Sequence, residues 1–292
     1  MPRPVGGRAS SDPARGSTQT GNLWSQPTIL GGCQGSTGPS SPATGGEPWG
    51  GSFPYVTVRD QVRAEAALAD SLGIDRWYGV IGGSAGGMRA IEWAVEWPER
   101  VERLFLLATS AEQIALSSIQ VDAIRADPFY SRGDYYSGPA GPLKGLDIAR
   151  RIAHLSYRSE FELADRFGRS PQGDEVIGEG GRFAIESYLQ YHGTKLLKRF
   201  DANSYIVLSE AMNSHNVGRG RGGIEAALAR VTAWTLVAGI DSDRLYPLHQ
   251  QQQLADGILT SGPLEIVKSP HGHDGFLIEI DQVGELARSL LT

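Results

Sequence analysis

The chain has 292 residues, of which 40% are hydrophobic and 21% charged, and its formal net charge is −6. These values are ordinary for a soluble globular protein with one large domain or two modest ones. The lack of a basic excess argues against nucleic acid or an anionic membrane as the main partner, and no apolar run approaches the roughly 20 residues that crossing a bilayer requires. Cys33 is the only cysteine, which excludes an internal disulfide and a cysteine-based zinc site and favours a reducing cytoplasm.

The N-terminal part of the sequence shows little sign of regular structure. Residues 1–29 are rich in Gly, Pro, Ser, Thr and Arg and show no apolar period, so we expect them to be disordered. Residues 31–54 are predicted to form a loop region. Order is expected to begin at Thr57, which forms a variant capping box with Asp60 ahead of an amphipathic helix that extends to Leu72.

Two β-prone runs flank a second helical pattern in the next part of the chain. They are residues 77–81 (WYGVI) and 101–108 (VERLFLLA), and the helix between them stops at Pro98. A strand, a helix and a strand within so short a span predict a parallel sheet with right-handed crossovers.

The character of the sequence then changes. Residues 111–230 carry helical patterns without a convincing strand, and the strand pattern returns at residues 234–239 (WTLVAG) and 264–268 (LEIVK), before a closing amphipathic helix. We therefore predict an α/β fold in which residues 30–110 and 231–292 form a mostly parallel sheet with its helices. The residues between these two segments are predicted to be an inserted helical lid.

A glycine-rich pentapeptide, Gly82–Gly86 (GGSAG), has the form G-x-S-x-G and lies between a predicted buried strand and a predicted helix. This context places a serine on a tight turn, with its hydroxyl exposed at the edge of the sheet. Ser84 would then be a nucleophile, and the N–H of Ala85 at the start of the helix would point at a developing oxyanion. The alternative is a structural turn with an incidental serine.

A serine nucleophile needs a base that a third group orients. In folds with this serine turn the acid and then the histidine follow along the chain, each after a late strand. Asp241 and Asp243 follow the third predicted strand, and His271 and His273 follow the fourth. The residues alone leave both candidates open at each position, because any of them could be a turn or loop residue.

Other features of the sequence point less clearly to chemistry. Residues 218–223 (GRGRGG) satisfy G-x-G-x-x-G, but no strand precedes them, so a mobile loop is favoured over contact with a cofactor phosphate through Arg219 or Arg221. No metal-ligand spacing is present, and no bound metal is expected. Four further histidines lie in helical patterns or in polar stretches away from a nucleophile: His154, His192, His215 and His249.

Several longer segments match a known family: GGCQGSTGPSSP, TVRDQV, GGSAGGMRAIEW, ARRIAHLSYRSE, RFDANSYIVLSEAMN, VGRGRGG, DSDRLYPL and GHDGFL. They resemble the homoserine O-acetyltransferases, which are α/β-hydrolase-fold enzymes of methionine biosynthesis. The resemblance runs from about Leu30 to the C-terminus, and shared segments over such a length are far more specific than one short motif. It implies an α/β-hydrolase-type, mostly parallel sheet with an inserted helical lid.

The resemblance also implies which residues carry the reaction. The family nucleophile matches Ser84. The family acid lies in an S-D-x-L-[FY]-P segment and matches Asp243, and the family base lies in a G-H-D-G-F segment and matches His273. Ala85 follows the nucleophile, where the family usually has Met, and its backbone N–H would be one oxyanion donor. The family's second donor belongs to an H-A-L-T-G-like segment after a strand that pairs with the nucleophile strand. We do not find that segment here, so the resemblance implies an unpaired strand edge and weakened activity or stability.

The substrate contacts follow from the same resemblance. Arg150 matches the arginine that holds the amino-acid carboxylate, Asp274 an aspartate suited to the ammonium group, and Tyr157 a further pocket position. No cofactor is expected to be bound: acetyl-CoA would be a co-substrate, and L-homoserine would accept the acetyl group from an acyl-serine intermediate. The resemblance implies a homodimer, and the charge and cysteine content described above predict a cytoplasmic protein without nucleic-acid or membrane partners.

Three other functions stay open at this point. A related enzyme could use succinyl-CoA as the donor or serine as the acceptor, water could replace homoserine in a serine hydrolase, or the chain could be an inactive remnant that serves as an interaction protein. CoA release with and without homoserine separates the transferase from the hydrolase. Labelling of Ser84 by a fluorophosphonate separates both from the remnant.

Overall fold

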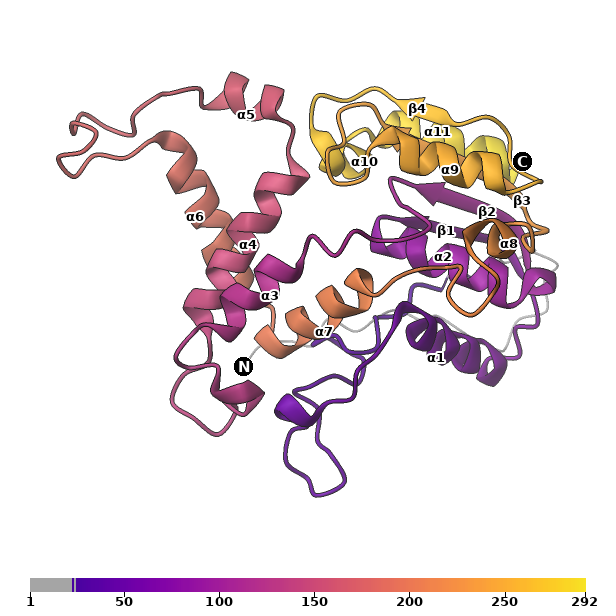
Figure 1. The fold of residues 1–292 in the computed structure, drawn as a ribbon, viewed down its shortest axis with the longest axis horizontal. Helices are drawn as coiled ribbons and strands as arrows, with labels where there is room; N and C mark the ends of the chain where they lie inside the picture. Colours follow the sequence, from indigo (N-terminus) through magenta and orange to yellow (C-terminus); the bar gives the residue numbers. More distant parts are fainter. Residues whose placement is uncertain (1–22, 24) are drawn as a thin grey trace, which may run out of the picture.

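The computed structural model describes residue 23 and residues 25–292. The disorder expected for residues 1–29 therefore falls largely outside the described residues. The described chain has a core built on a β-sheet and a group of helices beside it, with α7 (Ala202–Asn213) between the two parts (Figure 1).

Four parallel strands form the sheet: β1 (Trp77–Gly83), β2 (Val101–Leu107), β3 (Trp234–Ile240) and β4 (Glu265–Val267). Their order in space is the same as in the chain, β1-β2-β3-β4. Gly83 pairs with Leu107, and Leu107 pairs with Ala238, so the carboxyl ends of three strands meet at one edge. The parallel sheet predicted from the sequence is confirmed.

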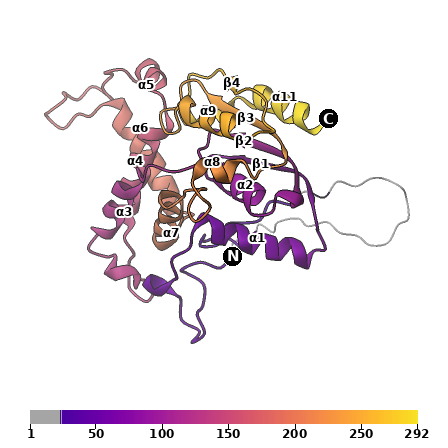
Figure 2. The same cartoon turned by 45° about the vertical axis from the view of Figure 1, so that its right-hand side comes forward.

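Helices cover both faces of this sheet (Figures 1 and 2). Four belong to one face: α1 (Val58–Ser71), α2 (Ala85–Glu96), α8 (Ile224–Leu228) and α9 (Leu248–Gly257). The opposite face is covered by α11 (Ile280–Leu291), the closing helix predicted from the sequence.

Alternating side chains of β2 explain the two apolar layers. Leu104 and Leu106 pack on the side of α2, whereas Phe105 and Leu107 pack on the side of α11. All four are buried. A run of consecutive apolar residues such as Leu104–Leu107 is what a sheet covered on both faces requires, because successive side chains point to opposite faces.

The capping box predicted at the start of α1 is present. The Thr57 hydroxyl accepts a hydrogen bond from Asp60 N at 3.2 Å, and Asp60 Oδ2 accepts one from Thr57 N at 3.0 Å. Val58, Val62 and Ala66 then lie on the buried side of the helix. Satisfying the exposed N–H groups in this way fixes where the helix begins.

The region between β2 and β3 contains helices and no strand, as predicted for residues 111–230. Besides α7 and α8 it contains α3 (Ser118–Arg125), α4 (Leu143–Tyr157), α5 (Glu160–Arg166) and α6 (Ala184–Leu197). Of these helices, α3, α4, α6 and α7 enclose an apolar cluster of their own, which includes Ile124, Leu146 and Leu196. In both views α4, α5 and α6 stand to one side of the sheet (Figures 1 and 2).

The loop predicted over residues 31–54 is irregular apart from one turn of 3-10 helix, Gly50–Ser52. Its position is nevertheless fixed, because Gln34 Nε2 donates to the Arg199 carbonyl at 2.9 Å and Asp201 N donates to Cys33 Sγ at 3.4 Å. Among the described residues, no helix is both long enough and apolar enough to span a membrane.

Candidate active site

Ser84 lies on the tight turn between β1 and α2. Its φ of 54° and ψ of −127° form a backbone conformation that residues other than glycine rarely adopt. Hydrogen bonds hold the turn: Ser84 N donates to the Leu107 carbonyl at 2.9 Å, and the Thr109 hydroxyl donates to the Ser84 carbonyl at 2.8 Å. A Cβ on Gly82 would collide with the backbone of Gly86, so this position needs glycine for the strand and helix to approach.

The side chains of Ser84, His273 and Asp243 form a hydrogen-bonded triad. His273 Nε2 lies 2.9 Å from Ser84 Oγ, and His273 Nδ1 lies 2.7 Å from Asp243 Oδ2. The other oxygen, Asp243 Oδ1, accepts from the backbone N–H groups of Leu245 at 2.8 Å and Tyr246 at 3.0 Å. The oriented, fully buried carboxylate favours a proton on Nδ1, which leaves Nε2 free to accept the serine proton.

The alternative acid and base lie elsewhere. Asp241 Oδ1 accepts from Ser269 N at 3.0 Å, and its other oxygen pairs with Lys268 Nζ at 3.4 Å. His271 Nδ1 faces Glu162 Oε1 at 3.5 Å. Neither Asp241 nor His271 belongs to the hydrogen-bonded triad that contains Ser84. The structure thus brings together the residues that the resemblance selected and separates them from the alternatives.

A cavity of about 520 Å³ opens over Ser84, between the sheet and the inserted helices. Ser84, Tyr246 and His273 line it from the side of the sheet, and Arg150 and Tyr157 line it from α4. The start of α3, the end of α7 and the residues that follow His273 also line it. The inserted helices therefore cover the nucleophile, as expected of a lid, and leave room for an amino acid beside the end of an acyl donor.

Arg150 provides a cation to this cavity. No ion pair joins its guanidinium to a carboxylate of the described residues, and it lies 5.5 Å from the centre of the Tyr157 ring. Burial raises the pKa of the Tyr157 hydroxyl, so this ring stays neutral beside the cation. A guanidinium that faces a cavity without a protein partner is suited to bind a carboxylate.

Asp274 also lines the cavity, but it already has a cationic partner. Its Oδ2 lies 3.1 Å from Arg158 Nη2, and Arg158 pairs in turn with Glu162 at 3.1 Å. Burial raises the pKa of Asp274, and the nearby Arg158 limits that rise. Arg158 and Glu162 are not among the site residues predicted from the sequence. Their spacing of four residues is a helical ion-pair signal, but nothing in that spacing indicates Asp274 as a third member.

The end of α4 is packed tightly against the loop that carries His273. Gly272 has a φ of +67°, and a Cβ there would lie 2.6 Å from Ser159 N and 2.8 Å from the Tyr157 carbonyl. The Ser159 hydroxyl donates to the Pro270 carbonyl. These contacts fix the helix that carries the cavity's arginine relative to the imidazole, so the inserted region helps to place both substrate and base.

The Ala85 N–H lies in the first turn of α2. Among the described residues it has no hydrogen-bond partner, and the positive end of the helix dipole lies there. It is thus available as a donor to an oxyanion on a carbon bonded to Ser84 Oγ.

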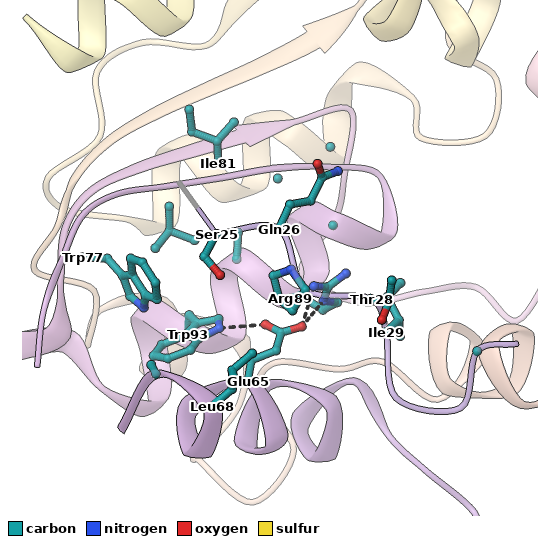
Figure 3. Close-up of a pocket in the computed structure, with 18 of the residues that line it drawn as sticks. Ser25, Gln26, Thr28, Ile29, Glu65, Leu68, Trp77, Ile81, Arg89 and Trp93 are labelled. Atoms are coloured by element: carbon teal, nitrogen blue, oxygen red, sulfur yellow. Dashed lines mark hydrogen bonds and ion pairs between the residues drawn. The ribbon is translucent and has the colours of Figure 1, made fainter. Parts of the chain in front are cut away.

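The nucleophile strand has one free edge in the described sheet. β1 pairs with β2 alone, and its other edge borders a cavity of about 560 Å³ (Figure 3). Trp77 and Ile81 of β1 face this cavity, and on its floor Glu65 accepts hydrogen bonds from Arg89 Nε at 2.7 Å and Trp93 Nε1 at 2.9 Å. The unpaired edge that the resemblance implied is present among the described strands.

The glycine-rich loop at residues 218–223 is held on α2, so the expectation of a mobile loop is corrected. Arg221 is almost fully buried and pairs with Glu92 at 2.7 Å and Glu96 at 2.5 Å, while Arg219 donates to the Ser214 carbonyl. Both cations of the motif are thus engaged within the protein. In the described part of the chain, no group of three or more His, Cys, Asp or Glu side chains is arranged to hold a metal ion.

The remaining histidines lie outside the hydrogen-bonded triad. His154 is buried against His192, with their ring centres 4.0 Å apart, and burial together with the nearby Arg150 lowers the pKa of His154 to about 3. Burial lowers the pKa of His215 to about 4. His249 is exposed.

Comparison with known proteins adds independent evidence. Residues 28–279 match the α/β hydrolase fold family. The homoserine O-acetyltransferase of Thermobifida fusca (strain YX) is 58% identical over 270 residues, which cover 91% of this chain and 71% of that protein. The chain belongs to the homoserine O-acetyltransferase family. A second family member, from Mycobacterium tuberculosis (strain CDC 1551 / Oshkosh), is 52% identical over 267 residues, covering 90% of this chain and 70% of its own length.

Solved structures extend this assignment to the fold. The homoserine O-acetyltransferase from Bacillus anthracis superimposes with a TM-score of 0.80 at 26% identity, covering 88% of this chain and 71% of that chain. Esterase E22 superimposes with a TM-score of 0.78 at 27% identity, covering 88% and 73%. The architecture of this homoserine O-acetyltransferase family member is therefore shared with an esterase as well as a transferase.

Proposed function

We propose that this protein transfers an acetyl group from acetyl-CoA to the hydroxyl of L-homoserine through an acetyl-serine intermediate. The observation that carries the proposal is the hydrogen-bonded triad of Ser84, His273 and Asp243 beside a cavity that is also lined by Arg150, whose guanidinium pairs with no carboxylate of the described residues. The triad supplies an activated nucleophile, and the Arg150 guanidinium supplies a site for an amino-acid carboxylate.

In the first half-reaction Ser84 Oγ attacks the thioester carbonyl while its proton moves to His273 Nε2. Asp243 accepts a hydrogen bond from Nδ1 and stabilises the imidazolium that forms. The Ala85 N–H stabilises the oxyanion. As the C–S bond breaks, the CoA sulfur leaves with the proton from Nε2, and the acetyl group remains on Ser84 Oγ.

In the second half-reaction the hydroxyl of homoserine replaces the thiol. His273 Nε2 takes the proton of this hydroxyl as its oxygen attacks the acetyl-serine, and it returns a proton to Ser84 Oγ when the new ester leaves. Water would hydrolyse the same intermediate. The inserted helices that cover the cavity support the transfer because they limit access of water to it.

The acceptor contacts follow from the charges in the cavity. Arg150 binds the carboxylate of homoserine, and Asp274 with Tyr157 binds near its ammonium group. Arg158 already pairs with Asp274, so its positive charge offsets much of the attraction that the Asp274 carboxylate exerts on a second cation. Its proposed role is therefore to orient the ammonium group by one hydrogen bond rather than to neutralise it. We further propose that the enzyme works in the cytoplasm as a homodimer and holds no resident cofactor.

A second candidate function is hydrolysis of small acetyl esters. Esterase E22 favours it, because the two chains share a fold at a TM-score of 0.78 and 27% identity. In that function water takes the place of homoserine at the acetyl-serine, and Arg150 would not be needed for turnover.

The decisive experiment measures CoA release from acetyl-CoA with and without L-homoserine and follows the acetylated product by mass spectrometry. The proposal expects acetyl-homoserine in amounts equal to the CoA released, and no product from Ser84→Ala. Equal CoA release with and without homoserine, with acetate as the product, would favour the hydrolase. A Ser84→Ala variant with unchanged turnover would refute both functions.

A further inference from the structure

The peptide group between Ser84 and Ala85 contains both the carbonyl of the nucleophile and the N–H that is available to an oxyanion. This peptide is trans, and a trans peptide is planar, so its C=O and N–H lie in one plane and point in opposite directions. Whatever fixes the Ser84 carbonyl therefore also fixes the direction of the Ala85 N–H. The aim of the oxyanion donor thus depends on the groups that hold that carbonyl.

The first turn of α2 gives this peptide group little support of its own. Serine is a favoured N-cap residue, but the Ser84 hydroxyl lies 2.9 Å from His273 Nε2 and makes no capping hydrogen bond. Gly86 and Gly87, which follow in the turn, are poor helix formers. From within α2 the Ser84 carbonyl accepts from Gly87 N at 2.9 Å and from Met88 N at 3.2 Å. A turn of this composition keeps one orientation only if a group outside the helix anchors it.

Thr109 supplies that anchor. Its hydroxyl donates to the Ser84 carbonyl at 2.8 Å, and among the described residues it is the one donor outside α2 that this carbonyl has. The Thr109 side chain is fully buried, and a Cβ on Gly87 would lie 2.5 Å from it. The first turn of α2 therefore packs directly on Thr109, at a distance that only glycine allows.

Thr109 is itself held in place by two neighbouring elements. The preceding residue, Ala108, has a φ of 47°, and its N–H donates to the Ala238 carbonyl of β3 at 2.9 Å. A positive φ outside glycine costs free energy and persists where the surrounding structure fixes it. Gln251 of α9 is fully buried and donates from Nε2 to the Thr109 carbonyl at 2.6 Å. The anchor of the nucleophile turn is thus a rigid part of the core.

We propose that Thr109 is a positioning residue for the oxyanion donor: its hydroxyl holds the peptide group between Ser84 and Ala85 and so keeps the Ala85 N–H directed at the acyl oxygen as that oxygen becomes negative. The proposal rests on the proposed function, because it requires an acyl group on Ser84. Thr109 acts through this peptide group, and no proton leaves its hydroxyl. A donor that is already aimed needs no reorientation when the charge develops, and this preorganisation is the source of the effect.

The test is Thr109→Val, which keeps the shape of the side chain and removes its hydroxyl. We expect kcat for acetyl transfer to fall about tenfold, because the Ala85 N–H remains and only its direction is loosened; outright removal of an oxyanion donor costs roughly 10²–10³. KM for homoserine should change by less than about twofold, since Arg150 is untouched. Thr109→Ser keeps the hydroxyl and should restore most of the activity.

Thr235→Val is the matched control. Thr235 is 1% exposed, and its hydroxyl donates to the Ala233 carbonyl at 2.9 Å, away from the residues that line the cavity over Ser84. Each variant loses one buried hydrogen bond to a backbone carbonyl, so we expect both to lower the melting temperature by a similar amount. Only Thr109→Val should lose kcat. Equal losses of kcat in the two variants would show a general effect of stability and would overturn the proposal.

A tetrahedral mimic and a pH profile separate an effect on the oxyanion from a distortion of the triad. A small alkyl boronic acid that adds to Ser84 should bind Thr109→Val more weakly, by a factor close to the loss in kcat. The pH at which kcat/KM reaches half its maximum should not move, because His273 keeps its bonds to Ser84 and Asp243. Unchanged kcat would overturn the proposal, and so would a loss of kcat with unchanged boronic-acid affinity or with a shifted pH profile.

A second variant covers the case in which Thr109→Val does not fold. Thr109→Cys retains only a weak donor and should show the same paired losses, whereas kcat and boronic-acid affinity equal to those of the unchanged protein would overturn the proposal. If the unchanged protein forms no acetyl-serine with acetyl-CoA, the proposed function itself fails. If it does and Thr109→Val forms acetyl-serine at the same rate, only the role of Thr109 fails.

Discussion

Replacing Asp243 by Asn tests whether this carboxylate sets the protonation of His273 in the hydrogen-bonded triad. Asp243 Oδ1 accepts from two backbone N–H groups, and Oδ2 faces His273 Nδ1 at 2.7 Å. An asparagine can keep the two backbone bonds only by turning its NH₂ group toward Nδ1. A donor cannot face a donor, so the imidazole must move its proton to Nε2, where it can no longer accept the Ser84 proton.

The expected loss is about 10⁴-fold in kcat, the size seen when this tautomer is inverted in a Ser-His-Asp site, which corresponds to about 5.4 kcal/mol of transition-state stabilisation. CoA release under saturating substrates measures it, and thermal melting checks that the fold persists. Asp241→Asn is the matched control, because its carboxylate binds Ser269 N and Lys268 instead of an imidazole. If Asp243→Asn keeps more than a tenth of the activity, or if Asp241→Asn loses as much, Asp243 does not set the tautomer of His273.

Three further predictions follow from the cavity and the inserted helices. Arg150→Lys should raise KM for homoserine about tenfold or more, because an ammonium cannot form the bidentate pair, whereas acetylation of the protein by p-nitrophenyl acetate, followed as the nitrophenol burst, should stay within twofold. Gly272→Ala should lower both melting temperature and kcat, since a positive φ costs about 1–3 kcal/mol and the new Cβ meets backbone of Ser159. In His154→Phe the melting temperature should fall less steeply as the pH is lowered. The buried His154 imidazole has a pKa of about 3 in the folded protein, so the unfolded chain binds this proton more readily than the folded protein does. Its contribution to stability is complete above the unfolded pKa of about 6.5 and is lost as the pH falls from there toward 3.

Each of these outcomes has a control. Arg151→Lys is the control for Arg150→Lys, because Arg151 pairs with Asp147. An equal rise in KM for homoserine in Arg151→Lys would contradict the role given to Arg150. Gly262→Ala introduces a Cβ that meets nothing within 4 Å, so a matching loss would show that the effect is not local. For His154→Phe, a slope of melting temperature against pH identical to that of the unchanged protein would be the contradicting result, and exposed His249→Gln serves as the comparison.

The sequence predicted the sheet because its signals are local. The capping box at Thr57, the apolar runs of the strands and the glycines around Ser84 each act on neighbours in the chain, and each appears in the structure where it was expected. The choice between Asp241 and Asp243 is different in kind. It depends on which carboxylate the turn after β3 aims at a histidine 30 residues away, and both residues are equally reasonable turn formers.

The parts that sequence reasoning missed depend on contacts between distant segments. Arg158 reaches Asp274 because the end of α4 packs on the histidine loop, and a pattern within α4 contains no information about that loop.

The long helical insertion between β2 and β3 has a consequence for how this protein acquires activity. β1, α2 and β2 follow one another closely and can assemble early, but β3 must pair with β2 across the whole insertion, and His273 reaches Ser84 across 189 residues of chain. Closing such a large loop carries an entropic cost before any contact rewards it, and folds rich in distant contacts form slowly. After dilution from denaturant, the helical circular dichroism signal should therefore return well before turnover does.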